Sequence, residues 1–64
     1  MKKSKRVLEH HEFETCRKQR KLITVYFQGE PLQTNGIIQE HTEYFVIING
    51  DKFLKTACEF RITS

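Results

Sequence analysis

Long apolar runs and cysteine are scarce in this sequence, and each scarcity excludes a class of protein. A membrane-spanning helix needs about 20 apolar residues, and every apolar stretch of this sequence is far shorter. We therefore expect no membrane association. The basic start, Met1 to Lys3, is followed by charged residues instead of the apolar core of a signal peptide. Cys16 and Cys58 allow one disulfide at most, and their surroundings resemble those of a cytosolic chain rather than a secreted one. The sequence therefore predicts a cytoplasmic protein.

Recognisable catalytic and metal-binding patterns are also missing. No Ser-His-Asp, Cys-His or paired-carboxylate arrangement stands out, so we predict that the chain is not an enzyme. His10 and His11 lie close to Glu12 and Glu14, which raises the alternative of a metal site. Adjacent histidines on a helix point in different directions, however, and neither cysteine has a second ligand near it in the sequence. We therefore expect no metal and no cofactor.

The chain is short for a protein that folds alone. Its 64 residues fit one domain at most. A chain of this size buries only about 60% of its unfolded surface, which leaves it marginally stable by itself. Because small domains are commonly stabilised by a disulfide, a metal or a partner subunit, we expect self-assembly to supply the missing burial.

The charge that is present is unevenly distributed. Eleven basic and eight acidic side chains give a net charge of +3. Eight of the basic residues fall within residues 1–21 against three glutamates, so this segment carries +5 and the remainder −2. A basic N-terminal third indicates an anionic partner, most often a nucleic acid, although a solvated tail that only aids solubility is the alternative.

Residue patterns divide the chain into a helical first third and a β-rich remainder. Residues 7–20 contain no glycine or proline and place glutamates before arginines and lysines, which favours a helix. β-Branched and aromatic runs predict five strands, at residues 22–27, 36–39, 44–48, 52–55 and 59–62, with turns at Gly29-Glu30-Pro31 and Asn49-Gly50-Asp51. We expect a flexible basic arm at residues 1–5, then one mainly β domain over residues 6–64. This domain would be an N-terminal α-helix followed by a five-stranded, strongly bent antiparallel small barrel.

The order of several short motifs resembles that of a known family. The motifs, which span residues 7–63, are Arg17-Lys18-Gln19-Arg20, Ile23-Thr24-Val25-Tyr26-Phe27, Asn35-Gly36-Ile37-Ile38, Glu43-Tyr44-Phe45-Val46-Ile47-Ile48 and Leu54-Lys55-Thr56-Ala57-Cys58. In this order they resemble bacterial Hfq, the Sm-like RNA chaperone family, of which the chain looks like a divergent member. The resemblance implies an Sm-like (SH3-like) barrel that assembles into a homohexameric ring. It also implies binding of single-stranded A-rich or U-rich RNA and pairing of small regulatory RNA with mRNA in post-transcriptional regulation.

On the distal face of such a ring, the resemblance implies that Tyr26 stacks on the bases of A-rich RNA. Strand alternation supports an outward Tyr26, because it places Phe27 on the core side and leaves Thr24 and Tyr26 on the opposite side. By the same resemblance, Gln33 and Asn35 in the following loop would supply hydrogen bonds to the RNA.

On the proximal face, the resemblance implies that Tyr44 stacks on uracil and that Lys55 donates to the base or the phosphate. Ordinary core packing of Tyr44 and a merely solvated Lys55 are the alternatives. Thr56 stands where the family has a histidine, and Glu9 where many relatives have a glutamine. We expect Thr56 to reduce the affinity or selectivity for uridine. We expect Glu9 to weaken contact with RNA, because a carboxylate accepts hydrogen bonds, cannot donate them and repels phosphate.

At the rim, Arg17, Lys18 and Arg20 resemble the basic patch with which the Hfq family engages RNA and promotes annealing. The expected partners are thus RNA and further copies of this chain. The alternative is a small SH3-like barrel that binds proteins, such as a phage or plasmid regulator, without RNA chaperone activity.

Overall fold

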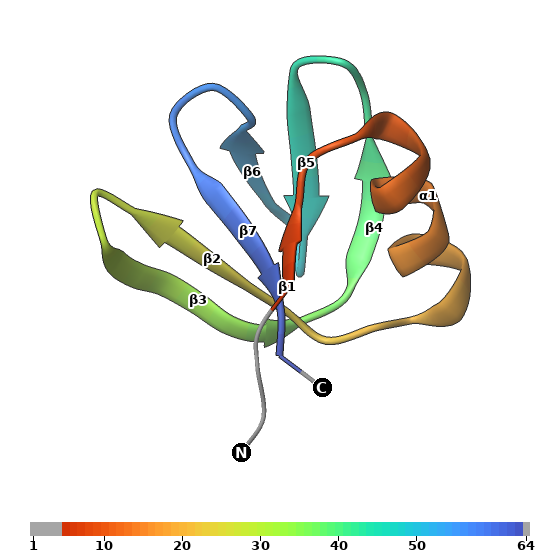
Figure 1. The fold of residues 1–64 in the computed structure, drawn as a ribbon, viewed down its shortest axis with the longest axis horizontal. Coiled ribbons are helices and arrows are strands. Elements are labelled where there is room, and N and C mark those ends of the chain that lie inside the picture. Colours follow the sequence, from red (N-terminus) through yellow and green to blue (C-terminus); the bar gives the residue numbers. More distant parts are fainter. Residues whose placement is uncertain (1–4, 64) are drawn as a thin grey trace.

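The computed structural model describes residues 5–63, which form seven strands and one short helix (Figure 1). In chain order the elements are β1 (Lys5–Val7), α1 (His10–Gln19), β2 (Ile23–Phe27), β3 (Glu30–Gly36), β4 (Ile38–His41), β5 (Phe45–Ile48), β6 (Asp51–Leu54) and β7 (Glu59–Ile62). The strands form two antiparallel sheets, sheet A in the order β1-β7-β2-β3 and sheet B in the order β4-β5-β6. The predicted mainly β, antiparallel fold is confirmed, whereas the five-stranded barrel is wrong. Residues 1–4 of the predicted arm lie outside the described residues.

A strand precedes the helix, so the prediction of a leading helix over residues 7–20 is wrong at its start. Val7 pairs with Phe60 of β7 and is only 3% exposed, so its side chain belongs to the core. The helix begins later, where the carboxylate of Glu12 accepts hydrogen bonds from the backbone N–H groups of Leu8 (2.9 Å) and Glu9 (2.8 Å). These hydrogen bonds set the start of α1 after Glu9. The residues before them, Lys5 to Val7, pair with β7 instead.

Strand β3 is the second element that the sequence did not predict. It lies at one edge of sheet A. Pro31 has no backbone N–H to donate, and an edge strand tolerates this because it has a hydrogen-bonded neighbour on one side only. The turn expected at Gly29-Glu30-Pro31 is formed instead by Gln28 and Gly29, with φ of 51° and 84°. Two successive residues at positive φ match the twist of the flanking strands, so β2 and β3 form a tight hairpin.

The passage from sheet A to sheet B depends on Gly36, the last residue of β3. A Cβ atom at this position would lie 2.2 Å from Cγ2 of Ile48, so only glycine fits against that side chain. The predicted turn at Asn49 and Gly50 is confirmed, with φ of 52° and 83°, and it joins β5 to β6.

The core lies between the two sheets and under α1. Val7, Phe60 and Val25 form a row of paired residues across β1, β7 and β2, and all three are buried. The Phe13 ring from α1 packs edge-on against the Phe60 ring, with centroids 5.4 Å apart. The helix thus reaches the core through Phe13, while it lies beside β4 of sheet B (Figure 1). Phe27, expected in the core, is 41% exposed because it ends its strand.

Candidate nucleic-acid interface

Tyr26 lies on the face of sheet A that turns away from α1 and the core. Successive residues of a strand point to opposite faces of the sheet. The row next to the core residues Val7, Phe60 and Val25 therefore faces away from the core. That row runs from Arg6 of β1 to Arg61 of β7 and on to Thr24 of β2. Tyr26 pairs with Glu59, two positions further along both strands. We call this surface the outer face, and its residues are Arg6, Thr24, Tyr26, Glu59 and Arg61.

The outer face combines an aromatic ring with cationic groups. Tyr26 is half-buried, so part of its ring remains accessible. The Arg61 guanidinium donates a hydrogen bond to the Glu59 carboxylate on the same strand. Arg6 is exposed, whereas Thr24 is only 3% exposed. An accessible ring beside guanidinium groups is an arrangement that binds single-stranded nucleic acid by stacking and ion pairing.

Gln33 and Asn35 do not join Tyr26 on this face. Gln33 pairs with Val25, which points into the core, and its amide donates to the Asp51 carboxylate of β6 at 3.0 Å. Asn35 lies at the far end of the β2–β3 ladder, where its side-chain oxygen accepts a hydrogen bond from Thr63 at 3.3 Å. The structure therefore leaves Tyr26 without the two hydrogen-bonding neighbours that the resemblance implied.

Tyr44 and Lys55 are brought together at the ends of β5 and β6. Tyr44 is 70% exposed, so it does not pack in the core. The backbone N–H of Lys55 donates to the Tyr44 carbonyl at 2.8 Å. The backbone N–H of Thr42 donates to the Phe45 carbonyl at 2.9 Å. The Thr42 hydroxyl also accepts hydrogen bonds from the backbone N–H groups of Tyr44 (3.1 Å) and Phe45 (3.2 Å). An exposed ring is thus fixed on a hydrogen-bonded backbone beside a lysine.

The Lys55 ammonium is turned towards the helix. Its Nζ lies 4.2 Å from the centre of the Phe13 ring, a cation–π contact that places part of the lysine under α1. Burial lowers the pKa of Lys55, and the nearby Glu43 carboxylate opposes that effect. Thr56 follows in the turn and is exposed, and Glu9 is exposed at the start of α1.

Glu14 organises the basic rim at the end of α1. Its carboxylate accepts two hydrogen bonds from the Arg17 guanidinium, at 3.1 and 2.5 Å, and lies 2.7 Å from Nε2 of His41 on β4. Lys18 Nζ lies 3.9 Å away. The hydrogen bonds from Arg17 lower the pKa of Glu14 most and the contact with His41 lowers it further, to about 2. Since Glu14 forms ion pairs with both Arg17 and Lys18, the exposed Arg20 is the more available cation of the rim.

A hollow of about 350 Å³ opens beside this rim. It is lined by Arg17, Arg20, Ile37, Ile38 and Gln39. Arg20 ends the helix in the left-handed conformation, with φ of 52°, and its N–H donates to the Arg17 carbonyl. The hollow thus joins two arginines to the bend between β3 and β4.

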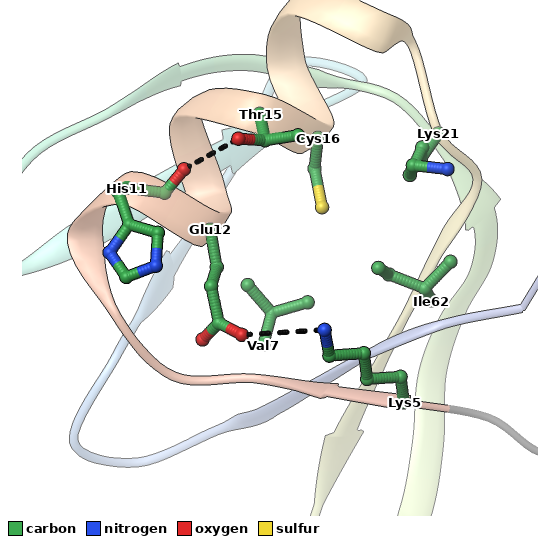
Figure 2. Close-up of a pocket in the computed structure, with 8 residues that line it drawn as sticks. All are labelled: Lys5, Val7, His11, Glu12, Thr15, Cys16, Lys21 and Ile62. Carbon is green, nitrogen blue, oxygen red and sulfur yellow. Dashed lines mark hydrogen bonds and ion pairs between the residues drawn. The ribbon is translucent and has the colours of Figure 1, made fainter.

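A second hollow of about 240 Å³ lies between β1 and α1 (Figure 2). Figure 2 shows the Cys16 sulfur pointing into it, with Lys5 reaching towards the Glu12 carboxylate at 3.9 Å. Burial raises the pKa of the Cys16 thiol, so it is protonated at neutral pH and is a poor nucleophile. Both cysteines are free thiols. Within residues 5–63, no group of three or more histidine, cysteine or acidic side chains is placed to hold a metal ion.

Arg6 and Arg61 are the residues of the outer face that sequence reasoning missed. They are 55 positions apart in the sequence, and only the pairing of β1 with β7 makes them neighbours. No local pattern predicts that pairing, because β1 contributes a single apolar side chain, Val7.

Comparisons with protein-family models, with curated proteins and with solved structures found no match for this chain. The likeness to the Hfq family therefore stays a prediction. None of the helical residues that the structure describes forms a segment long and apolar enough to cross a membrane.

Proposed function

We propose that this chain is an Hfq-like, single-stranded RNA-binding protein that assembles into a ring and promotes pairing of small regulatory RNA with mRNA. The observation that carries the RNA-binding part is Tyr44, whose 70% exposed ring stands on a backbone segment that is hydrogen-bonded to Lys55 and Thr42. Aromatic side chains stack on unpaired bases regardless of sequence, and nearby cations follow the phosphates. The outer face around Tyr26 and the rim cations supply two further surfaces of the same chemistry.

Self-assembly is proposed because one chain leaves apolar side chains and strand edges uncovered. Leu32 of β3 and Leu54 of β6 are each more than half exposed. In sheet B, β6 has only one described neighbour, so its outer edge can accept a strand from another copy. β7 is flanked by β1 and β2, so a neighbouring subunit would pair with β1 or β3 of sheet A instead. Closing a ring in this way would cover the edge of β6 and one edge of sheet A in every subunit. It would also repeat each proposed RNA-binding surface around the ring.

Fluorescence anisotropy with labelled oligo-U and oligo-A tests the RNA-binding proposal. Tyr44→Ala should weaken binding by about 1–3 kcal/mol, which is roughly 5- to 150-fold, because one stacked base is lost. Tyr44→Phe keeps the ring and should bind nearly as the unmodified chain does. Leu8→Ala removes another exposed apolar side chain away from the proposed site and serves as the matched control.

Two outcomes would contradict the proposal. One is an unmodified protein that binds neither oligonucleotide at low salt, and the other is equal binding by Tyr44→Ala and Leu8→Ala. Tyr26→Ala, measured in parallel, should affect oligo-A more than oligo-U if the outer face is the A-rich site.

A further inference from the structure

The hollow of about 240 Å³ between β1 and α1 has an apolar floor (Figure 2). Val7 of β1, Cys16 of α1 and Ile62 of β7 form this floor, and Val7 and Cys16 are only 3% and 1% exposed. An apolar cavity of about 150 Å³ can hold a benzene-sized molecule, whereas pockets for drug-sized ligands begin at about 300 Å³. The hollow therefore has room for one ring or a short aliphatic chain.

Two lysines flank the floor. Lys5 lies on β1, and Lys21 lies between α1 and β2. Burial raises the pKa of the Cys16 thiol, and the positive charges of Lys21 and Lys5 oppose that rise. The Glu12 carboxylate acts in the same direction as burial. Both ammonium groups are thus close enough to act on the sulfur at the floor, and an anion bound above the floor would interact with both.

These two ammonium groups keep hydrogen-bond donors for a ligand. Lys5 Nζ lies 3.9 Å from the nearer carboxylate oxygen of Glu12, which is too far for a hydrogen bond. The other oxygen of Glu12 accepts hydrogen bonds from the backbone N–H groups of Leu8 and Glu9. Among residues 5–63, no acceptor pairs with the Lys21 ammonium. One carboxylate thus faces two ammonium groups, and this balance favours an anionic ligand.

We propose that this hollow binds a small organic acid, with the apolar body of the acid on the floor and its carboxylate between the ammonium groups of Lys5 and Lys21. A carboxylate has two acceptor oxygens, so it can accept a charge-assisted hydrogen bond from each lysine. The bound acid would connect β1 to the segment between α1 and β2. The site is separate from the surfaces of the proposed RNA-binding function and goes beyond that function.

An NMR titration of the full chain with benzoate tests the site, because benzoate joins one ring to one carboxylate. The backbone amide signals of Val7, Cys16 and Ile62 should shift and saturate, with a dissociation constant in the millimolar range expected of so small a ligand. Benzamide has the same shape without the charge, so it should bind at least about 10-fold more weakly. All titrations are made at constant ionic strength.

Lys21→Gln removes one ammonium group and should weaken benzoate binding about 5- to 10-fold. Lys5→Gln should weaken it similarly, and circular dichroism verifies that each variant is folded. Lys52→Gln is the matched control, since it removes one exposed positive charge from β6 of the other sheet and should bind benzoate as the unmodified chain does. The site is wrong if benzoate and benzamide bind equally, or if both hollow variants bind benzoate as Lys52→Gln does. Failure of benzoate to shift these signals at tens of millimolar also contradicts it.

A second readout uses stability. A ligand that binds only the folded chain stabilises it, so benzoate should raise the urea midpoint of the unmodified protein. The increase should be smaller for Lys21→Gln at the same benzoate concentration, and an equal increase for both would contradict the site. Neither readout involves RNA, so a negative result leaves the proposed function standing.

Discussion

Docking of β1 against β7 makes Val7→Ala the most informative perturbation of the fold. Val7 is 3% exposed and pairs with Phe60, whose ring also receives Phe13 from the helix. Truncation removes the equivalent of two methylene groups, about 1.6 kcal/mol at about 0.8 kcal/mol each. The unfilled space adds to this loss, so we expect the free energy of unfolding to fall by about 2–3 kcal/mol.

That loss is large for so small a domain. A 64-residue chain has a total stability of roughly 3–10 kcal/mol, at about 0.05–0.15 kcal/mol per residue. The midpoint of thermal unfolding should fall by about 8 °C or more, since 1 kcal/mol shifts it by about 4–8 °C at this size. Urea unfolding followed by far-UV circular dichroism measures the change, and an unchanged slope would show that the transition stays two-state.

Leu8→Ala is the matched control, because the neighbouring Leu8 is 62% exposed. Its unfolding free energy should change by no more than about 0.5 kcal/mol. Equal destabilisation by the two variants would refute the placement of β1 in sheet A. A larger effect at Leu8 would point instead to a helix that starts earlier and presents its other face to the core.

The remaining predictions concern pH and packing. Hydrogen bonds from Arg17 and His41 lower the pKa of Glu14 from 4.5 to about 2, so this carboxylate stabilises the fold above pH 4.5 and loses that effect as the pH falls towards 2. Glu14→Gln should flatten the dependence of the urea midpoint on pH in that interval, and an unchanged acid dependence would contradict the contacts. Gly36→Ala should destabilise by about 1–3 kcal/mol, because its Cβ would lie 2.2 Å from Ile48; urea unfolding equal to that of the unmodified chain would disprove the close approach.

Local patterns were sufficient for the elements that carry their own signals. β5 is an apolar run, β7 alternates charged with apolar residues, and the Asn49–Gly50 turn has the residues that two successive positive φ angles require. β1 and β3 carry no such signals. β1 is a strand because β7 offers it an edge, and β3 tolerates Pro31 because it lies at the edge of its sheet.

Alternation along β2 predicted directions correctly but burial poorly. Thr24 lies in the row that faces away from Val25, as expected, yet it is only 3% exposed. Phe27 is on the expected side but at the end of the strand, and it is 41% exposed. Alternation therefore indicated the side of the sheet on which a residue lies but not its burial.

The candidate interface was predicted only in part. Tyr44 and Lys55 are neighbours because β5 and β6 form a hairpin that the sequence indicated. Gln33, by contrast, pairs with Val25 after a shift in the β2–β3 register and turns towards Asp51. The opposition of Arg6 to Arg61 depends on a pairing between the two ends of the described chain. Contacts formed within a hairpin were accessible to sequence reasoning, and contacts between distant strands were not.

Native mass spectrometry of the full chain, alone and mixed with an A-rich or U-rich oligonucleotide, tests the central proposal most directly. It reports the number of subunits and the number of RNA strands bound in one experiment. The proposal predicts a homo-oligomer, expected to be a hexamer, that retains RNA and releases it as the ionic strength rises. A monomer that carries no RNA at any salt concentration would contradict both the ring and the RNA-binding function.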